Sequence, residues 1–388
     1  MIDKVKVLDT FSGAGGFSLG FHLAGAKIIG AIEVDQWATD TFKYNHPDAK
    51  VIKKNISDMT DGEILHSFND VNIVLGGPPC QGFSICNKNN GDPKDPRNSL
   101  FEEFLRVGRL TLPNLMVMEN VPNIIKAKTI DGQFVIDIIK KELESLGYHV
   151  YSKVLEATDF GVPQIRKRLF VIASKIELKN PFPKPTHSIN GDGGLPKTPS
   201  LWDAISDLPN ISAREGSEVM EYDKEPLNEY QGMLRNHSLY LFNHKAMNHS
   251  KRLVERFNSM SWGQSTTDVP EHLRPLKRNS KEFSDKAYDQ NNRRMHPDKQ
   301  CHTITASFYA NFVHPYKDRN FTAREGARIQ SFPDWYKFEG KPTVVSQKLL
   351  QREGRMDEKY LCQYNQIGNA VPPLLSKAIA SHLINEVF

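Results

Sequence analysis

One of the four cysteines stands in a setting that suits a nucleophile. Cys80 lies in the string GGPPCQGFS, residues 76–84, directly after the apolar run Ile73–Leu75. The two prolines fix the backbone before the thiol and the flanking glycines leave space around it. An inert structural cysteine is normally buried among apolar neighbours instead. We therefore interpret Cys80 as a candidate for covalent catalysis.

Acidic and basic groups are expected near this thiol. Glu119 follows the apolar run Leu115–Met118, and the end of a neighbouring parallel strand would bring it close to Cys80. Alone, such a glutamate could cap a helix or form a salt bridge. Beside a presented thiol, general acid catalysis is the better interpretation. Arg166 and Arg168 alternate within QIRKR, residues 164–168, and would present their guanidinium groups on one side of a strand. The alternative is a basic edge strand whose charge discourages aggregation.

A glycine-rich turn indicates a ligand that approaches the backbone closely. The run Lys6–Leu8 leads into DTFSGAGGF, residues 9–17, with three glycines. Taken alone, a tight structural turn would explain them as well. Glu33 ends the next apolar run about twenty residues later, where a carboxylate can accept hydrogen bonds from ribose hydroxyls. Together the loop and Glu33 favour a cofactor that contains adenosine.

A parallel sheet would bring these groups to one edge. Up to Ala173, short apolar runs alternate with amphipathic stretches, which predicts an α/β fold with a Rossmann-like, doubly wound, mostly parallel sheet. Ligands bind at the carboxyl ends of the strands in such sheets. The predicted strands are Lys6–Leu8, Lys27–Ile32, Ile73–Leu75, Leu115–Met118, Val150–Leu155 and Leu169–Ala173, and the predicted helices are Leu100–Leu110 and Phe134–Leu146, the latter stopped by Gly147.

The sequence pattern changes after Ala173. Prolines become frequent and regular alternation is lost, so we predict a second, smaller and irregular domain from about residue 181 to 354, specialised for recognition. A helix around Ser250–Asn258 is the clearest element there. Pro372–Val387 has the pattern of an amphipathic helix that returns to the first domain. The predicted catalytic domain therefore comprises residues 1–180 plus 355–388.

Bulk composition narrows the class of protein. The chain has 388 residues, 39% of them hydrophobic and 25% charged, which is typical of a globular protein. A net charge of +4 does not by itself indicate nucleic acid, and the basic clusters in the second half could be an ordinary solvated surface. The cysteines lack metal-ligand spacing, and neither a signal peptide nor eighteen consecutive apolar residues occur. We predict a cytoplasmic protein without metal or membrane association.

Taken in order, these units resemble the motifs of the cytosine-C5 DNA methyltransferase family, in the bacterial form found in restriction-modification systems. The resemblance extends over about residues 5–175 and 293–388. Five motifs in the family's order make it specific. The matching segments are FSGAGG at 11–16, PPCQ at 78–81, ENV at 119–121, QIRKR at 164–168 and QYNQIGNAVP at 363–372, with ARE at 323–325 and RIQSFP at 328–333 before the last.

The resemblance implies S-adenosyl-L-methionine as the cofactor. Glu33 would hold its ribose, Val34 would lie against the adenine, and Asn369 with Val371 would close the pocket. At Asn55 the chain departs from the family, which usually has an acidic residue facing the adenine amino group. An asparagine oxygen can still accept that hydrogen bond. The implied cofactor-binding residues are Phe11, Gly13, Gly15, Gly16, Glu33, Val34, Asn55, Ile56, Pro78, Leu100, Asn369 and Val371.

The resemblance also implies a mechanism. Carbon 5 of cytosine is a poor nucleophile until a thiolate adds to carbon 6, and Cys80 would supply that thiolate. Glu119 would act as the acid at N3, while Arg168, with Arg166 behind it, would hold the base and orient the acid. The target must leave the duplex stack. The loop Ser84–Asn98 resembles the family's catalytic loop, which closes over the flipped base.

Double-stranded DNA is the partner that the resemblance implies. Recognition is expected between about residues 181 and 300, where base edges would be read from the major groove. The implied role is that of the modification enzyme of a restriction-modification system, or an orphan equivalent, paired with a restriction endonuclease. We expect a monomer on DNA, in the cytoplasm at the nucleoid. The candidate DNA-binding residues are Ser84, Arg97, Arg235, Arg252 and Arg278.

Three alternatives remain open. The same chemistry on a cytosine of transfer RNA is nearest, although the long variable segment favours duplex DNA. A catalytically silent nucleic-acid-binding protein with the same fold is the second, and the intact Cys80, Glu119, Arg166 and Arg168 argue against it. A dinucleotide-dependent oxidoreductase is the third; it would need a fuller Gly-x-Gly-x-x-Gly turn and has no use for Pro-Pro-Cys.

Overall fold

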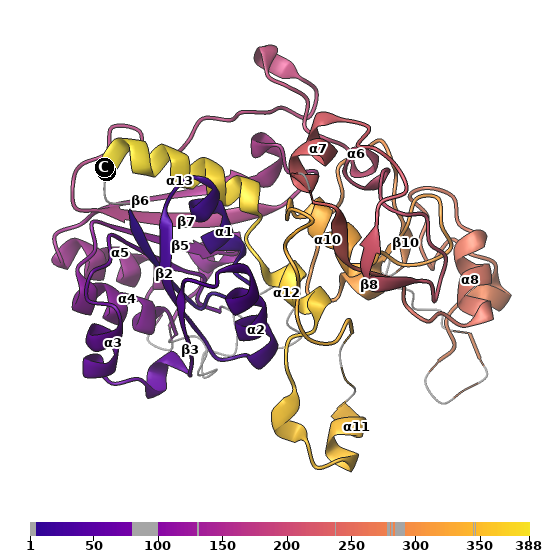
Figure 1. Ribbon diagram of the computed structural model, residues 1–388, viewed down its shortest axis with the longest axis horizontal. Coiled ribbons are helices and arrows are strands. Elements are labelled where there is room, and N and C mark those ends of the chain that lie inside the picture. Colours follow the sequence, from indigo (N-terminus) through magenta and orange to yellow (C-terminus); the bar gives the residue numbers. More distant parts are fainter. Residues whose placement is uncertain are drawn as a thin grey trace. The chain divides into compact units, whose positions relative to one another are not determined.

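The computed structural model of the chain is shown in Figure 1. It describes residues 5–79, 100–129, 132–236, 238–277, 280, 282–283, 292–343, 345 and 347–388. Two compact units are present. The first comprises Met1–Phe160, Arg166–His187 and Ala370–Phe388, and the second comprises Gly161–Ile165 and Ser188–Asn369. These units overlap the predicted domains over most of their length, and their assignment as catalytic and recognition domains stays a prediction.

A seven-stranded sheet forms the centre of the first unit, in the order β3-β2-β1-β4-β5-β7-β6. The pairs among β1 to β5 are parallel, whereas β7 pairs antiparallel with both β5 and β6. This sheet confirms the predicted doubly wound, mostly parallel fold. The strands are β1 (Lys6–Thr10), β2 (Lys27–Glu33), β3 (Lys50–Lys53), β4 (Ile73–Gly76), β5 (Leu115–Asn120), β6 (His149–Glu156) and β7 (Lys167–Ser174).

Helices cover both faces of this sheet. On one face, Leu8, Val74 and Met116 lie in a buried cluster with side chains of α3, α4 and α5, such as Phe104 and Ile139. On the other, α13 packs against α1, where the Ser376 hydroxyl donates to the Phe17 carbonyl at 2.6 Å. The helices are α1 (Gly16–Leu23), α2 (Gln36–Asn45), α3 (Asp61–Ser67), α4 (Leu100–Thr111), α5 (Val135–Ser145) and α13 (Pro373–Val387), with single turns Ile56–Asp58, Pro122–Lys126 and Ala157–Phe160.

Local signals explain where several helices begin and end. The Thr60 side chain and Glu63 form a capping box at the start of α3. Asp35 accepts from the Ala38 amide to start α2. After α5 the chain passes through Gly147 with φ 79°, a conformation that favours glycine, so the predicted stop lies at this position.

The second unit is irregular and has little sheet. Its strands pair only in twos, β8 with β9 and β10 with β11. The predicted helix near Ser250 is α8, where the Ser250 side chain caps the Leu253 amide. The elements are β8 (Gly216–Glu221), β9 (Tyr240–Lys245), β10 (Arg293–Arg294), β11 (Phe312–Val313), α6 (Leu201–Ile205), α7 (Glu229–Arg235), α8 (Lys251–Asn258), α9 (Phe308–Asn311), α10 (Ala323–Ile329), α11 (Gln347–Arg352), α12 (Gln363–Asn369) and single turns Asp192–Gly194, Glu271–Leu273 and Met356–Glu358.

The contact between α1 and α13 leaves no room for a side chain at Gly20. A Cβ there would stand 2.2 Å from the Ser376 Cβ. We expect Gly20→Ala to lower the free energy of unfolding by about 1–3 kcal/mol through overpacking, measured by urea denaturation. Gly62→Ala in α3 is the control, because a Cβ there meets nothing within 4 Å and alanine is the better helix former. Equal stability of the Gly20 variant and the wild type would contradict this packing.

Candidate active site

The register of the parallel strands brings three loops to one edge of the first unit. Thr10 at the end of β1 pairs with Gly76 of β4, and Gly76 pairs with Met118 of β5. The Thr10 hydroxyl donates to the Leu75 carbonyl at 2.9 Å and so ties β1 to β4. A Cβ at Gly76 would stand 2.5 Å from the Phe104 ring, so only glycine fits. The loops that follow these strands therefore leave the sheet side by side.

Glu33 joins the glycine-rich loop to the end of β2. Its Oε2 accepts from the Gly13 amide at 2.7 Å, and its Oε1 accepts from the Val34 and Asp35 amides at 2.8 and 2.9 Å. Oε1 therefore uses both of its lone pairs, whereas Oε2 keeps one, with which Glu33 can still accept from a ligand hydroxyl. The loop itself uses positive φ at Phe11 and Gly13, and a Cβ at Gly13 would meet nothing within 4 Å. Its backbone is therefore open to close approach.

The surroundings of this loop fit an adenosyl ligand. The Ser12 hydroxyl is buried, with 8% of the residue exposed, and it has no hydrogen-bond partner among the described residues. Such a group normally has a partner, which a ligand would supply here. Val34 is 61% exposed directly after Glu33 and offers an apolar surface to a flat ring. Ser12 could not be singled out from the sequence, because nothing in the string FSGAGG tells a buried hydroxyl from an exposed one.

The other predicted cofactor residues lie in varied places. Asn55 is exposed, and its side-chain oxygen accepts from the Ser57 amide at 3.2 Å. Ile56 is 3% exposed with its side chain in the core, so only its backbone could face a ligand. Pro78 is buried and its carbonyl accepts from the Asn120 side chain at 3.0 Å. Of the remaining predicted residues, Leu100 is half-buried at the start of α4, Asn369 is exposed at the end of α12, and Val371 is buried.

Glu119 and Arg168 form an ion pair at the end of β5. Arg168 Nε lies 2.8 Å from Glu119 Oε1. The Arg166 guanidinium, buried nearby, donates to the Ala370 carbonyl at 3.0 Å. Burial raises the pKa of Glu119 above its usual range even though both arginines lower it. A Cβ at Gly77 would stand 3.6 Å from Glu119 Oε2, so the segment that leads to Cys80 passes beside a carboxyl group suited to hold a proton.

Four predicted residues lie outside the described part of the chain, namely Cys80, Ser84, Arg97 and Arg278. Two other cysteines, Cys301 and Cys362, are buried. Burial raises the pKa of the Cys301 thiol, which keeps it protonated and a poor nucleophile. Of the thiols that the structure describes, neither therefore has the setting of a nucleophile.

Arg235 and Arg252, predicted to contact DNA, have partners within the second unit. Arg235 pairs with Asp207 at 2.6 Å and its guanidinium lies 3.8 Å from the centre of the Tyr222 ring. Arg252 Nη2 donates to the carbonyls of His272 and Arg274 at 2.9 and 2.7 Å. Both guanidinium groups are held by internal contacts in this arrangement. The sequence carries no signal of this, because these partners come from distant or irregular segments.

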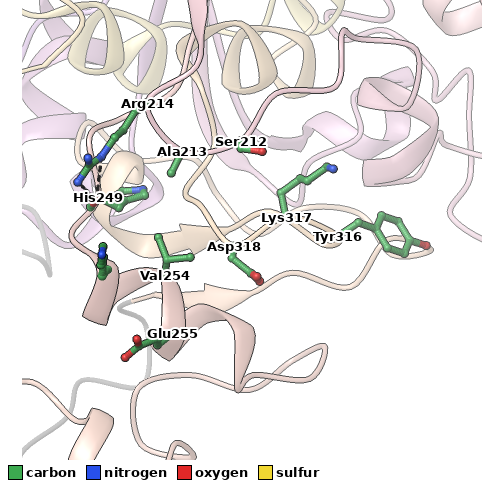
Figure 2. A pocket seen from close by; sticks show the side chains of 10 residues that line it. Ser212, Ala213, Arg214, His249, Val254, Glu255, Tyr316, Lys317 and Asp318 are labelled. Carbon is green, nitrogen blue, oxygen red and sulfur yellow. Dashed lines mark hydrogen bonds between the residues drawn. The ribbon is translucent and has the colours of Figure 1, made fainter.

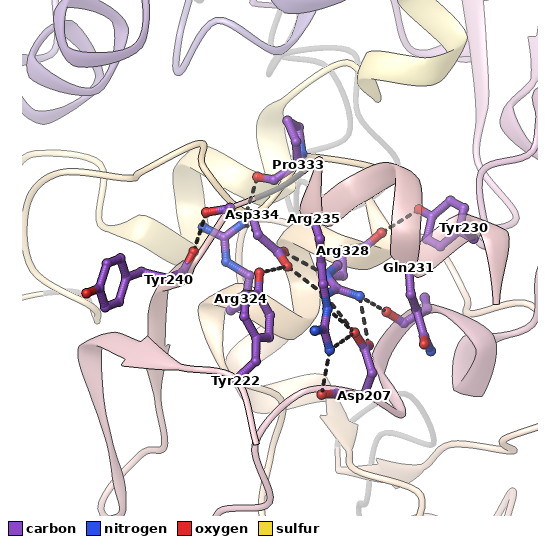
Figure 3. A network of polar contacts seen from close by, with 12 residues as sticks. Asp207, Tyr222, Tyr230, Gln231, Arg235, Tyr240, Arg324, Arg328, Pro333 and Asp334 are labelled. Carbon is purple, nitrogen blue, oxygen red and sulfur yellow. Dashed lines mark hydrogen bonds and ion pairs between the residues drawn. The ribbon is translucent and has the colours of Figure 1, made fainter. Parts of the chain in front are cut away.

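Arg235 belongs to a buried network of charges that holds the second unit together, shown in Figure 3. Arg328 pairs with Asp207 at 3.0 Å and with Asp334 at 2.6 Å, and all three side chains are fully buried. Arg324 donates to the carbonyls of three further residues, Phe242, Pro333 and Tyr336. Each buried charge thus has partners, as burial requires. The ARE and RIQSFP segments therefore serve the architecture of this unit.

A basic hollow lies elsewhere in the second unit, shown in Figure 2. It is a cavity of about 640 Å³ lined by Arg214, Lys251 and Lys317 together with the acidic Glu255 and Asp318. Neither Lys251 nor Lys317 forms an ion pair with another residue that the structure describes. These two ammonium groups are therefore available to an anionic partner.

Within the ranges given above, no group of three or more His, Cys, Asp or Glu side chains could hold a metal ion. No helix in the described part of the chain has the length and apolar character to cross a membrane.

Comparisons with known proteins agree with the resemblance in the sequence. A family model described as C-5 cytosine-specific DNA methylase matches residues 5–385. The chain is 46% identical to Type II methyltransferase M.DdeI of Desulfomicrobium norvegicum, over 98% of this chain and 88% of that protein. It is 36% identical to Type II methyltransferase M1.HphI of Haemophilus parahaemolyticus, over 98% and 87%.

Solved structures share the fold. The chain is similar, with a TM-score of 0.73 and 24% identity over 99% of both chains, to a protein described as a DNA modification methyltransferase encoded within a prophage of E. coli. The Dnmt2 methyltransferase of S. pombe gives a TM-score of 0.60 at 17% identity, again over 99% of both chains.

The internal contacts of Arg235 predict a structural defect when it is replaced. We expect Arg235→Ala to lower the free energy of unfolding, at the lower end of about 3–5 kcal/mol, because the buried Asp207 keeps Arg328 but loses one partner. Lys251→Ala, at an exposed position, should change it by less than about 0.5 kcal/mol. Denaturant titration measures both. An Arg235 variant as stable as the Lys251 variant but weakened in DNA binding would instead support the DNA contact predicted from the sequence.

Proposed function

This chain belongs to the C-5 cytosine-specific DNA methylase family and is a DNA cytosine-5-methyltransferase; from that premise we propose a covalent mechanism. A methyl group passes from S-adenosyl-L-methionine to carbon 5 of a cytosine in double-stranded DNA while Cys80 is bonded to carbon 6. The observation that carries this proposal is the buried Glu119, held by Arg168 beside Gly77. It sets a proton donor next to the segment that presents the thiol.

Cys80 and Glu119 divide the activation of the ring between them. The Cys80 thiolate bonds to carbon 6, and the electrons of the 5,6 double bond move toward N3. Glu119 donates its proton at N3 and so offsets the charge that develops there. Arg168 then pairs with the carboxylate that Glu119 becomes, which keeps the ionised form bound in place. Once carbon 5 carries the methyl group, its proton is lost to a base, the 5,6 double bond forms again and the thiolate leaves. The N3 proton returns to the Glu119 carboxylate, which restores the acid.

The residues around the glycine-rich loop would hold the cofactor. When bound, S-adenosyl-L-methionine supplies an electrophilic methyl group attached to a sulfonium. Glu33 would accept from a ribose hydroxyl through Oε2, which keeps one free lone pair. Phe11, Gly13, Gly15 and Gly16 would let the loop backbone approach the ligand. Val34 would lie against the adenine, and the Ser12 hydroxyl would gain a hydrogen-bond partner, which it does not have among the described residues.

Access to carbon 6 requires the cytosine to leave the duplex stack. We assign recognition of the duplex to the second unit, in line with the domain predicted over residues 181–354. Lys251 and Lys317 of its basic hollow suit phosphate oxygens. Because the similar proteins are named Type II methyltransferases, the proposed role is modification in a restriction-modification system, with a restriction endonuclease as partner and action as a cytoplasmic monomer.

Transfer of labelled methyl groups tests the proposal directly. The purified chain should label duplex DNA and not transfer RNA, and Cys80→Ser should abolish labelling while binding of S-adenosyl-L-methionine persists. Cys86→Ser is the matched control from the same segment and should stay active. A duplex with 5-fluorocytosine at the target should form an adduct that resists denaturation with the wild type and the control. Normal turnover by Cys80→Ser would refute covalent catalysis. Labelling of transfer RNA alone would contradict duplex DNA as the proposed substrate.

The raised pKa of Glu119 predicts a pH dependence. The protonated acid is the active form, so the rate should fall as pH rises through this raised pKa. Glu119→Gln should reduce the rate by about 10²–10⁴-fold and remove this alkaline decline. Glu142→Gln is the control, because Glu142 is a surface partner of Arg109. An unchanged pH profile of the single-turnover rate in Glu119→Gln would exclude Glu119 as the acid.

A further inference from the structure

The carboxyl group of Asp9 is buried at the base of the glycine-rich loop, and the mechanism above does not use it. Asp9 is 1% exposed on β1, one residue before the strand ends. Its Oδ2 accepts from the Ser18 hydroxyl of α1 at 2.6 Å, and Ser18 is fully buried. This hydrogen bond joins the strand before the loop to the helix after it. Asp9 therefore lies within the structure that shapes the cofactor loop.

The electrostatic surroundings of Asp9 are unfavourable to its charge. Glu33 of β2 repels it, and neither carboxylate forms an ion pair with a residue in the described ranges. The cross-strand neighbours Ala31 and Leu75 are apolar. His22 of α1 and Lys377 of α13, the helix packed on α1, are exposed to solvent. The first unit thus carries two buried carboxyl groups beside the loop without a described cation to balance them.

These surroundings place the titration of Asp9 near neutrality. Burial, and to a lesser degree repulsion by Glu33, raises the pKa of Asp9 to about 7, against the lowering effect of the Ser18 hydrogen bond. Burial raises the pKa of Glu33 as well. A cation that binds beside such groups favours their ionised form, because opposite charges attract strongly where water is excluded.

We propose that Asp9 makes the site respond to the charge of its ligand, releasing a proton when the cationic methyl donor binds and keeping it when the neutral demethylated product binds. This inference rests on the proposed function in taking a sulfonium compound as the donor. Methyl transfer turns the sulfonium into an uncharged thioether, so the product loses one positive charge. The Asp9 carboxylate then takes up a proton from water. Affinity for the donor over the product consequently increases as pH rises through neutrality.

Calorimetry measures this proton directly. Binding of S-adenosyl-L-methionine and of S-adenosylhomocysteine is compared near pH 7 in two buffers of different ionisation enthalpy. We expect the donor to release more protons than the product from the wild-type protein, and this difference to disappear in Asp9→Asn. An asparagine oxygen can still accept from Ser18, so the fold should persist. Asp40→Asn, which changes a carboxylate on α2, is the matched control and should behave as the wild type.

Dissociation constants between pH 6 and 8 give a second measurement. Because ionisation of the ligand itself is the same for both proteins, the ratio of wild type to Asp9→Asn isolates the contribution of Asp9. For the donor this ratio should change by up to about tenfold, equivalent to a one-unit pKa difference, and for the product by much less. Equal proton release by both ligands, or a difference that survives in Asp9→Asn, would overturn the inference. Failure of the folded wild type to bind the donor would instead overturn the proposed function.

Discussion

The level register of β1, β4 and β5 is the constraint on which the site depends. With Thr10, Gly76 and Met118 as neighbours, the glycine-rich loop, the segment toward Cys80 and the side chain of Glu119 all lie at one edge of the sheet. Side chains alternate between the two faces of a strand, so a shift of one residue would turn Glu119 to the opposite face. The Thr10 hydroxyl and the absence of a side chain at Gly76 fix this register, because no other residue would fit against the Phe104 ring.

The two units differ in whether their buried charged side chains have partners of opposite charge. In the second unit, Arg328 is matched by Asp207 and Asp334, so the network is complete without a ligand. In the first, Glu33 accepts from three backbone amides and Asp9 accepts from Ser18, but neither carboxylate has a cation as partner among the described residues. A matched network stabilises an architecture, whereas unmatched carboxyl groups beside a loop make binding of a cation favourable. The same residue types are therefore matched by opposite charges in the second unit and unmatched, among the described residues, in the first.

Much of the fold and part of the site could be predicted from the sequence. Apolar runs revealed six strands, but β3 was missed because KVIK is short, flanked by charge and at the edge of the sheet. Glu119 lies near Arg168 because β5 and β7 pair antiparallel. No local sequence pattern predicts that these two strands are neighbours. Asp9 and Ser12 went unnoticed because their significance lies in burial, which depends on α1 and Glu33. We predicted that Arg235 contacts DNA. Its internal partner Asp207 could not be identified from the sequence, because the two residues are brought together only by folding.

The packing of α13 on α1 has a consequence for synthesis of the chain. Residues of the second unit stand in the sequence between the sheet of the first unit and the helix that completes it. As translation proceeds, α1 is synthesised early and has an apolar surface. The helix that packs on this surface, α13, is synthesised last. The ribosome must therefore finish the whole inserted unit before the first unit can close, and a nascent chain that stalls short of Ala370 leaves the face of α1 beside Gly20 open to water.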